Sequence, residues 1–303
     1  MATPIQTTAT ISTLVVIGVG LIGGSLARAL RRRGVIGRIV GCGRNRESLE
    51  TARRLGVIDA VETDAARAVT GADVVVLATP VGAMPAVLES IAGHVQPAAV
   101  VTDVGSVKGA VVEAARAALG AGIRRFVPGH PIAGTERSGV AASFAELFEG
   151  RRVVLSPCAE TDGDAVERVR LMWEAAGARV SIMEAAVHDR VFAETSHLPH
   201  VLAYALVDCL ARSDDGPAIF RYAAGGFYDF TRIASSDPVM WRDICVANAG
   251  NVGASLDRLR AALDEAAAAI ARGDGEWLEE MFARAKQARD SLLPADARDA
   301  SPE

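Results

Sequence analysis

Short apolar runs alternate with segments of helical spacing through the first 183 residues. The apolar runs have the length of β-strands, and the segments between them repeat apolar residues every three or four positions. After the run that ends at Ile17, strands are expected at residues 38–43, 73–78, 98–102, 126–127, 152–156 and 179–182. Helices are expected after Gly23, before Gly56 and at residues 164–176.

This alternation is typical of a parallel, doubly wound sheet with helices on its faces. We expect the strands at residues 152–156 and 179–182 to complete that same sheet. Ligands of such folds bind beside the carboxyl ends of the strands. The predicted fold is therefore an α/β doubly wound (Rossmann-type) nucleotide-binding domain.

The pattern changes after Met183, where strand-like runs end and helical spacing continues. The helical stretches run through Leu210, from Pro238 to Leu263 and from Glu276 to Leu293, whereas a glycine- and aromatic-rich segment, residues 225–237, is expected to interrupt them as a loop. An all-α domain is therefore expected to follow the first one.

The predicted division is a dinucleotide-binding domain at residues 1–183 and a helical substrate and dimerisation domain at residues 184–303. The long helices of the second domain are rich in alanine and leucine. They would bury more apolar surface against a second copy of the chain, which predicts a homodimer.

The first strand passes into a helix through Gly18, Gly20 and Gly23. In the dinucleotide fingerprint the first glycine permits the tight turn, the second lets the backbone approach a pyrophosphate, and the third lets the helix pack on the strand. Leu21 and Ile22 begin that helix, whose N-terminus would face the anion. The alternative is a glycine-rich turn without a ligand.

Two other strand ends are predicted to contact the cofactor. Thr79 and Pro80 follow the strand at residues 73–78, and Asp103 and Gly105 follow the strand at residues 98–102. All four would lie at the carboxyl edge of the sheet.

The end of the second strand bears on the choice of nucleotide. An acidic residue there would bind the ribose 2′-hydroxyl of NAD, but this chain has Gly43 followed by Arg44. Arg44, with Arg46, could pair with a 2′-phosphate, so NADP is predicted in preference to NAD. The alternative is that both arginines are solvated, or that Arg44 stacks on adenine.

Composition and charge narrow the partners. The chain has 303 residues, half of them hydrophobic, and a net charge of −5, which argues against nucleic-acid and anionic-membrane partners. Four widely spaced cysteines without a CxxC pair are typical of reduced thiols in a cytoplasmic protein. Neither a signal peptide nor a membrane span is predicted.

His130 is the first candidate for chemistry, because it follows a predicted strand in what is expected to be a loop at the crevice. Its ordinary pKa suits acid or base work, although a structural histidine is the alternative. Ser106 could cap the next helix or orient His130. Lys108, one of only two lysines, could contact phosphate or ribose, and the sequence does not decide its role.

The helical domain contributes further candidates. His197 and His200 lie three residues apart, but no second ligand set accompanies them, so no metal is predicted and His200 is the expected substrate contact. Arg232 could bind a carboxylate with both guanidinium nitrogens. Trp241 is either a pocket residue or a core tryptophan.

Five motifs together resemble the prephenate/arogenate (cyclohexadienyl) dehydrogenase family of tyrosine biosynthesis. They are Gly-Val-Gly-Leu-Ile-Gly-Gly-Ser (18–25), Asp-Val-Gly-Ser-Val-Lys-Gly (103–109), Gly-His-Pro-Ile-Ala-Gly-Thr-Glu (129–136), Ser-His-Leu-Pro-His (196–200) and Asp-Phe-Thr-Arg-Ile-Ala-Ser-Ser-Asp-Pro-Val-Met-Trp (229–241). The first motif is common to many dehydrogenases, whereas the others in this order are specific.

The resemblance implies oxidative decarboxylation of prephenate or arogenate, with hydride transfer to NAD(P)+. It implies that His130 takes the proton of the ring hydroxyl, that Ser106 positions both groups, and that Arg232 binds the ring carboxylate. The rest of the implied pocket consists of Thr135, Glu136, Ser196, His200 and Trp241.

Some alternatives stay open at this point. The sequence does not distinguish prephenate from arogenate, and feedback by tyrosine is compatible with the resemblance. A β-hydroxyacid dehydrogenase would carry glycine four residues before its catalytic lysine, but Val104 and Phe282 precede the two lysines here. A non-catalytic NADP sensor would need none of His130, Ser106 and Arg232.

Overall fold

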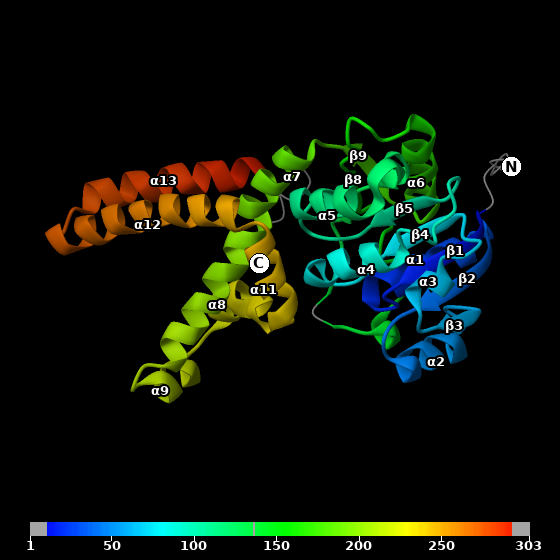
Figure 1. Cartoon of the computed structure of the whole chain (residues 1–303). Helices are drawn as coiled ribbons and strands as arrows, with labels where there is room; N and C mark the ends of the chain where they lie inside the picture. The colour runs from blue at the N-terminus through cyan, green and yellow to red at the C-terminus, as the bar shows by residue number, and fades with distance from the viewer. Residues whose placement is uncertain (1–10, 136, 293–303) are drawn as a thin grey trace, which may run out of the picture. The chain divides into compact units, whose positions relative to one another are not determined.

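The computed structural model describes residues 11–135 and 137–292, and its chain divides into two compact units, residues 1–252 and 253–303. The first unit contains a six-stranded parallel sheet of order β3-β2-β1-β4-β5-β6 (Figure 1). Its strands are β1 (Ile11–Ile17), β2 (Ile36–Cys42), β3 (Ala60–Glu62), β4 (Val74–Leu77), β5 (Val100–Asp103) and β6 (Phe126–Val127). The doubly wound fold is therefore confirmed.

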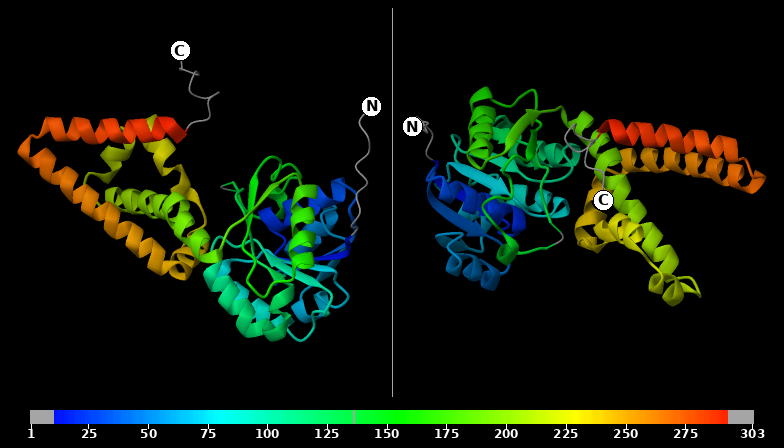
Figure 2. Two further views of the ribbon diagram at one scale, coloured as in Figure 1. Left: turned by 90° about the horizontal axis from the view of Figure 1, so that it is seen from above. Right: turned by 180° about the vertical axis from the view of Figure 1, so that it is seen from behind.

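Helices cover both faces of this sheet because alternate residues of each strand point to opposite sides. In β1, Leu14 and Val16 pack with the first group of helices, and Val15 and Ile17 pack with the second. The first group is α1 (Leu21–Arg32), α2 (Arg46–Arg54) and α6 (Gly163–Ala175); the second is α3 (Ala65–Ala68), α4 (Met84–Ile91) and α5 (Gly109–Leu119). Figures 1 and 2 show the sheet between them.

Two of the expected strands belong to a different sheet. A separate three-stranded sheet consists of β7 (Gly129–Pro131), β8 (Arg152–Leu155) and β9 (Arg179–Ile182), so the prediction that residues 152–156 and 179–182 complete the main sheet is wrong. The main sheet ends at the two-residue strand β6, which Pro128 follows. A proline has no N–H to donate, and the chain restarts as β7, antiparallel to β8.

The part of the first unit that follows residue 183 is helical within the described residues. It comprises α7 (Ala185–Phe192), a π-helical turn (Ala193–His197), α8 (Leu198–Ala211), α9 (Gly216–Arg221), α10 (Gly225–Thr231), a 3₁₀ turn (Arg232–Ser235), α11 (Pro238–Ala247) and the start of α12 (Ala249–Arg272). Asp237 caps α11 by accepting a hydrogen bond from the Met240 N–H at 2.8 Å.

Two details differ from the helical prediction. Residues 225–235 of the expected loop form α10 and a 3₁₀ turn instead. Gly225 and Gly226 lie in the first turn of α10, where they do not interrupt it, and the Thr231 hydroxyl donates to the Phe227 carbonyl one turn earlier. The expected helix at residues 238–263 is interrupted at Asn248, whose side chain bonds to other elements.

The second unit contains most of α12 and all of α13 (Gly275–Leu292), which meet at a short turn around Gly273 (Figure 2). Leu263, Ile270 and Phe282 are exposed large apolar side chains of this unit. None of the described helices is long and apolar enough to cross a bilayer.

Candidate active site

The glycine turn has the geometry that a dinucleotide requires. Gly18 has φ +99°, and a Cβ there would lie 2.4 Å from the Ala78 carbonyl oxygen. A Cβ on Gly23 would lie 2.5 Å from the Gly18 oxygen, whereas one on Gly20 would meet no atom within 4 Å. The turn is thus tight at its first and third glycines and open at the second, where a pyrophosphate would approach.

Two further features fit a nucleotide at this edge. No side chain caps the N-terminus of α1, so its first N–H groups are open to an anion. The buried Thr79 hydroxyl at the end of β4 has no hydrogen-bond partner among the described residues. A buried polar atom of this kind is usually satisfied by a ligand or water, so the residues present fit a dinucleotide.

The residues predicted to select the nucleotide lie beside β2. Gly43 is half-buried directly after the strand, and Arg44 and Arg46 are exposed. Asn45 caps α2 by accepting a hydrogen bond from the Ser48 N–H at 3.0 Å. The cap fixes the backbone around the two arginines and leaves their side chains in solvent.

Asp103 and Lys108 form a fully buried ion pair behind this edge. Asp103 also accepts hydrogen bonds from the N–H groups of Gly105 at 2.8 Å and Gly129 at 3.1 Å, and Lys108 donates to the Gly129 carbonyl at 2.6 Å. The Asp103 side chain, predicted to contact the cofactor, therefore ties β5 to β7. The suggestion that Lys108 contacts phosphate or ribose is wrong, because protein atoms enclose its ammonium.

His130 lies on β7 and not in a loop, with only 9% of its surface exposed. Its Nδ1 lies 2.8 Å from Nε2 of His188, whose Nδ1 lies 2.8 Å from Oδ1 of Asp189. Burial lowers the pKa of His130 well below 6.5, and the charge of Lys108 lowers it further. His130 is therefore neutral at neutral pH, as a general base must be.

Asp189 also occupies the start of α5. Its carboxylate oxygens accept hydrogen bonds from the N–H groups of Lys108 and Gly109, both at 2.7 Å. Ser106 is half-buried and lies two residues before Lys108, the N-cap residue of α5. The N-cap side chain itself makes no capping hydrogen bond. Of the two roles considered for Ser106, capping of this helix is therefore excluded, and Asp189 on α7 fills that role.

The other predicted residues gather on the helical side. Trp241 is buried and stacks on His200 with ring centroids 3.5 Å apart, and the Nδ1–H of His200 donates to the Ser196 carbonyl at 2.9 Å. His197 is buried and contacts the Asn248 amide at 3.1 Å. Asn248 in turn donates to the Asp189 carbonyl at 2.8 Å, so this group is continuous with the His130 network.

Two buried nitrogens of this cluster have no partner among the described residues, namely Nε2 of His197 and Nε1 of Trp241. Burial lowers the pKa of His197 to about 4, so it too is neutral. Buried polar atoms without a protein partner next to a buried base are expected where a substrate binds.

Three predicted residues stand apart from the contacts described so far. Arg232 begins the 3₁₀ turn that packs against α8, and Tyr204 of α8 donates to the Ser236 carbonyl at 2.6 Å at the end of that turn. Thr135 is exposed. Glu136 lies outside the described residues.

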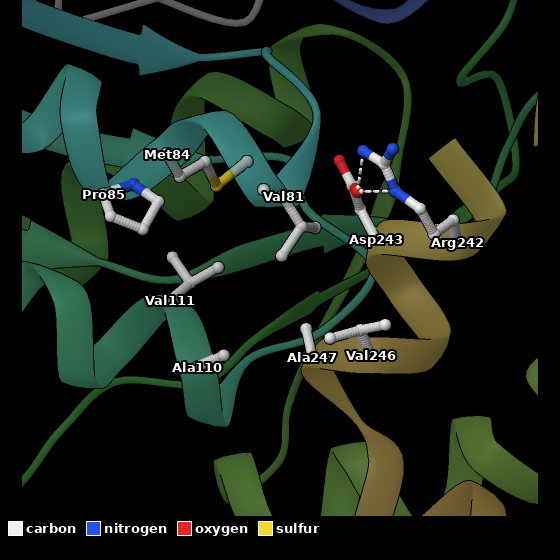
Figure 3. A pocket seen from close by; sticks show the side chains of 10 residues that line it. Val81, Met84, Pro85, Ala110, Val111, Arg242, Asp243, Val246 and Ala247 are labelled. Carbon is white, nitrogen blue, oxygen red and sulfur yellow. Dashed lines mark hydrogen bonds and ion pairs between the residues drawn. The ribbon is translucent and has the colours of Figure 1, made fainter. Parts of the chain in front are cut away.

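A separate cavity of about 230 Å³ lies between α4, α5 and α11 (Figure 3). Val81, Val111 and Val246 make it mainly apolar, and an ion pair between Arg242 and Asp243 lies at one side. None of its lining residues belongs to the predicted site. Among the residues that the structure describes, no group of histidine, cysteine or acidic side chains is arranged to hold a metal ion.

Sequence reasoning missed His188, Asp189 and Asn248. One signal was available, because the chain has only five histidines and four of them lie in this cluster, whereas His94 is exposed. His188 also follows the predicted domain boundary within one helical turn.

Comparison with known proteins gives consistent matches over nearly the whole chain. Residues 26–182 match the family model described as "Prephenate dehydrogenase, nucleotide-binding domain", and residues 184–284 match "Prephenate dehydrogenase, dimerization domain". Cyclohexadienyl dehydrogenase of Zymomonas mobilis is 39% identical over 281 residues, which are 92% of this chain and 95% of the relative.

Solved structures agree with these matches. Prephenate dehydrogenase from A. aeolicus, in complex with hydroxyphenyl propionate and NAD+, is 40% identical with a TM-score of 0.88, covering 95% of this chain and 100% of that one. Synechocystis arogenate dehydrogenase is 30% identical with a TM-score of 0.77, covering 93% of this chain and 100% of that one.

Proposed function

The chain belongs to the prephenate dehydrogenase family, and from this premise we propose that it oxidatively decarboxylates prephenate, arogenate or both. The products are 4-hydroxyphenylpyruvate and tyrosine, respectively, and carbon dioxide. The observation that carries the proposal is the buried, neutral His130 at the carboxyl edge of a dinucleotide fold. A bound nicotinamide dinucleotide supplies the acceptor for the hydride.

His130 acts on the ring hydroxyl in this proposal. Its Nδ1 faces His188, so Nε2 is the nitrogen left for the substrate. As the ring carbon is oxidised, Nε2 accepts the hydroxyl proton and a carbonyl forms. The ring carboxylate then leaves as carbon dioxide, and its bonding electrons enter the ring and turn the carbonyl into a phenolate. The phenolate takes the proton back from Nε2 of His130, and aromatisation of the ring drives the reaction. The protein mainly has to orient the ring and remove one proton.

We assign the substrate pocket to the residues around the unpartnered nitrogens. Arg232 binds the ring carboxylate, because its guanidinium matches a carboxylate in geometry and charge. The Nδ1–H of His200 is taken by the Ser196 carbonyl, so its Nε2 faces a ligand as an acceptor. The other assigned residues are Ser106, Thr135, Glu136, Ser196 and Trp241.

NADP is the proposed preference over NAD. The support is local, because Gly43 and not an acidic residue directly follows β2, and the exposed Arg44 next to it is available to a 2′-phosphate. Replacing Arg44 with alanine should raise the KM for NADP and leave that for NAD within about twofold. A protein that strongly prefers NAD would contradict this assignment.

The helical part is proposed to form a homodimer, with the domain boundary between Met183 and Glu184. The boundary coincides with the gap between the two matched family models, and the second of these is described as a dimerization domain. A cytoplasmic location is proposed as well, since all four cysteines are free thiols.

The test is an assay of the purified protein with prephenate and with arogenate, each against NAD and NADP. Turnover of at least one pair is expected, and His130→Asn should reduce kcat by at least about 100-fold while ligands still bind. Exposed His94 provides the control His94→Asn, which should retain activity. Tyrosine is included as an inhibitor, because it is the product from arogenate and resembles the product from prephenate, so it should compete for this site. Full activity of His130→Asn would exclude the base role.

A further inference from the structure

We propose that His188 and Asp189 are positioning residues that hold His130 in the tautomer with a proton on Nδ1 and share the positive charge that His130 acquires. The inference rests on the proposed function, because it assigns a partner to the base of that reaction. Its basis is a continuous chain of side chains from β7 to α7 that buries three ionisable groups together.

Asp189, at one end of this hydrogen-bonded series of side chains, can only accept hydrogen bonds. The carboxylate of Asp189 accepts the N–H groups of Lys108 and Gly109 at 2.7 Å, and these donors cannot reverse. Burial by itself raises the pKa of Asp189, but the hydrogen bonds from His188 and from the two N–H groups outweigh it and leave the pKa below its usual value. Asp189 is therefore ionised and can only accept.

The tautomers of both histidines follow from this. Nδ1 of His188, 2.8 Å from Asp189 Oδ1, must carry a hydrogen. A neutral imidazole has one donor and one acceptor, so Nε2 of His188 is the acceptor. Nδ1 of His130, 2.8 Å away, must then donate. Nε2 of His130 is left with its lone pair, which is what a base needs.

The same contacts provide a path for charge. When Nε2 of His130 takes the hydroxyl proton, its Nδ1 proton can move to Nε2 of His188. The electron pair on each accepting nitrogen forms the new N–H bond, and no oxidant or reductant is involved. The positive charge then lies beside the Asp189 carboxylate, where the attraction is largest in a buried site.

Packing holds the side chains of His130, His188 and Asp189 in place. The Phe192 ring lies 4.9 Å from the His130 ring and 4.5 Å from the His188 ring, measured between centroids. The Asn248 amide donates to the Asp189 carbonyl at 2.8 Å. The other charged or titratable groups facing the two rings are Lys108 at the start of α5, Asp103 at the end of β5 and His197 on the π turn.

A purely structural role is the competing explanation, because Asp189 also joins α7 to the N-terminus of α5. Variants at His188 separate the two roles, since they leave those helix contacts intact. His188→Gln keeps an oxygen that can accept from His130 Nδ1 but cannot take a proton. His188→Leu removes both abilities. His94→Leu is the control at an exposed histidine.

The kinetic test measures kcat, KM and the pH profile of each variant with the substrate and cofactor that the wild type uses. We expect kcat to fall by about 10-fold in His188→Gln and about 100-fold in His188→Leu, with KM values within about twofold. In Asp189→Asn the loss of negative charge should move the acid limb of kcat to lower pH and reduce the plateau. Unchanged kcat in His188→Leu would overturn the proposal. Equal losses of kcat in both His188 variants, together with an acid limb that does not move in Asp189→Asn, would overturn it as well.

A second measurement does not depend on turnover. Nitrogen NMR of the imidazoles in the full-length protein identifies the tautomer of each histidine, and the proposal requires hydrogen on Nδ1 of both His130 and His188. Hydrogen on Nε2 of neutral His130 would refute the inference even in an active enzyme. Absence of wild-type turnover with the expected tautomers would instead refute the proposed function.

Discussion

Residues that are costly to bury are concentrated at this site. His130, His188, Asp189 and His197 are buried together, and each is satisfied at least in part by another polar group. Burying such groups is unfavourable unless they are hydrogen-bonded. Their grouping therefore marks a place where chemistry, and not only packing, sets the side chains.

The buried base predicts a particular pH dependence. Burial lowers the pKa of His130 well below 6.5, and a base acts only when unprotonated. The kcat at saturating substrate should therefore stay constant as the pH falls through 6.5 and decline only at lower pH. The measurement is kcat between pH 5 and 9, with His130→Asn expected to lose the acid limb. A limb at or above pH 6.5 would contradict the assignment.

Lys108 gives a stability prediction at the same scale. Lys108→Met leaves the Asp103 carboxylate buried without its cation, and such losses cost about 3 kcal/mol in unfolding free energy. Urea unfolding measures this. Lys286→Met is the matched control, because its ion pair with Asp290 is exposed and its loss should cost less than about 1 kcal/mol. Equal costs for the two variants would show that the buried pair is not stabilising.

At the scale of elements, two glycines of the β1–α1 turn serve different purposes: Gly18 is needed for folding and Gly20 for dinucleotide binding. Gly20→Ala adds a methyl group to open space, so stability should change little while dinucleotide affinity falls by about 10-fold or more. Gly18→Ala should destabilise the protein itself, because φ is +99° and the methyl group would meet Ala78. Thermal unfolding and cofactor titration measure the two effects. Unchanged affinity in Gly20→Ala would place the pyrophosphate elsewhere.

Local patterns were sufficient to predict several elements. β1, β4 and β5 stand in apolar runs of strand length, α6 has helical spacing, and the glycine spacing indicated the turn after β1. The sheet that holds β8 and β9 was not predictable, because an apolar run does not specify its partner strand. β3 has only three residues and was missed for lack of length.

The site was predictable only in part, for a similar reason. His130, His200 and Trp241 stand in motifs that can be read along the chain. The contact between His130 and His188 joins residues 58 positions apart, and the Asp189 contact with Lys108 joins residues 81 positions apart. Such pairs depend on how α7 packs against β7 and α5, and a local sequence pattern does not predict that packing.

At the scale of the whole molecule, the unit at residues 253–303 buries few of its own side chains. No residue of α13 is buried, and Leu263, Ile270 and Phe282 are exposed. Apolar surface of this extent is typical of an interface between subunits. We therefore expect the protein to sediment with twice the chain mass of 31.5 kDa.

Introducing a charge on this apolar surface tests that expectation. Phe282 is 60% exposed in the single chain, and Phe282→Asp would place a carboxylate in an apolar interface, raising the dimer dissociation constant by about 10-fold or more. Leu55→Asp is the control, since Leu55 is 45% exposed at the end of α2 in the other unit and should leave the dimer intact. Sedimentation across a concentration series distinguishes the two variants. A wild-type monomer at micromolar concentration, or equal weakening by both substitutions, would show that α13 does not form the interface.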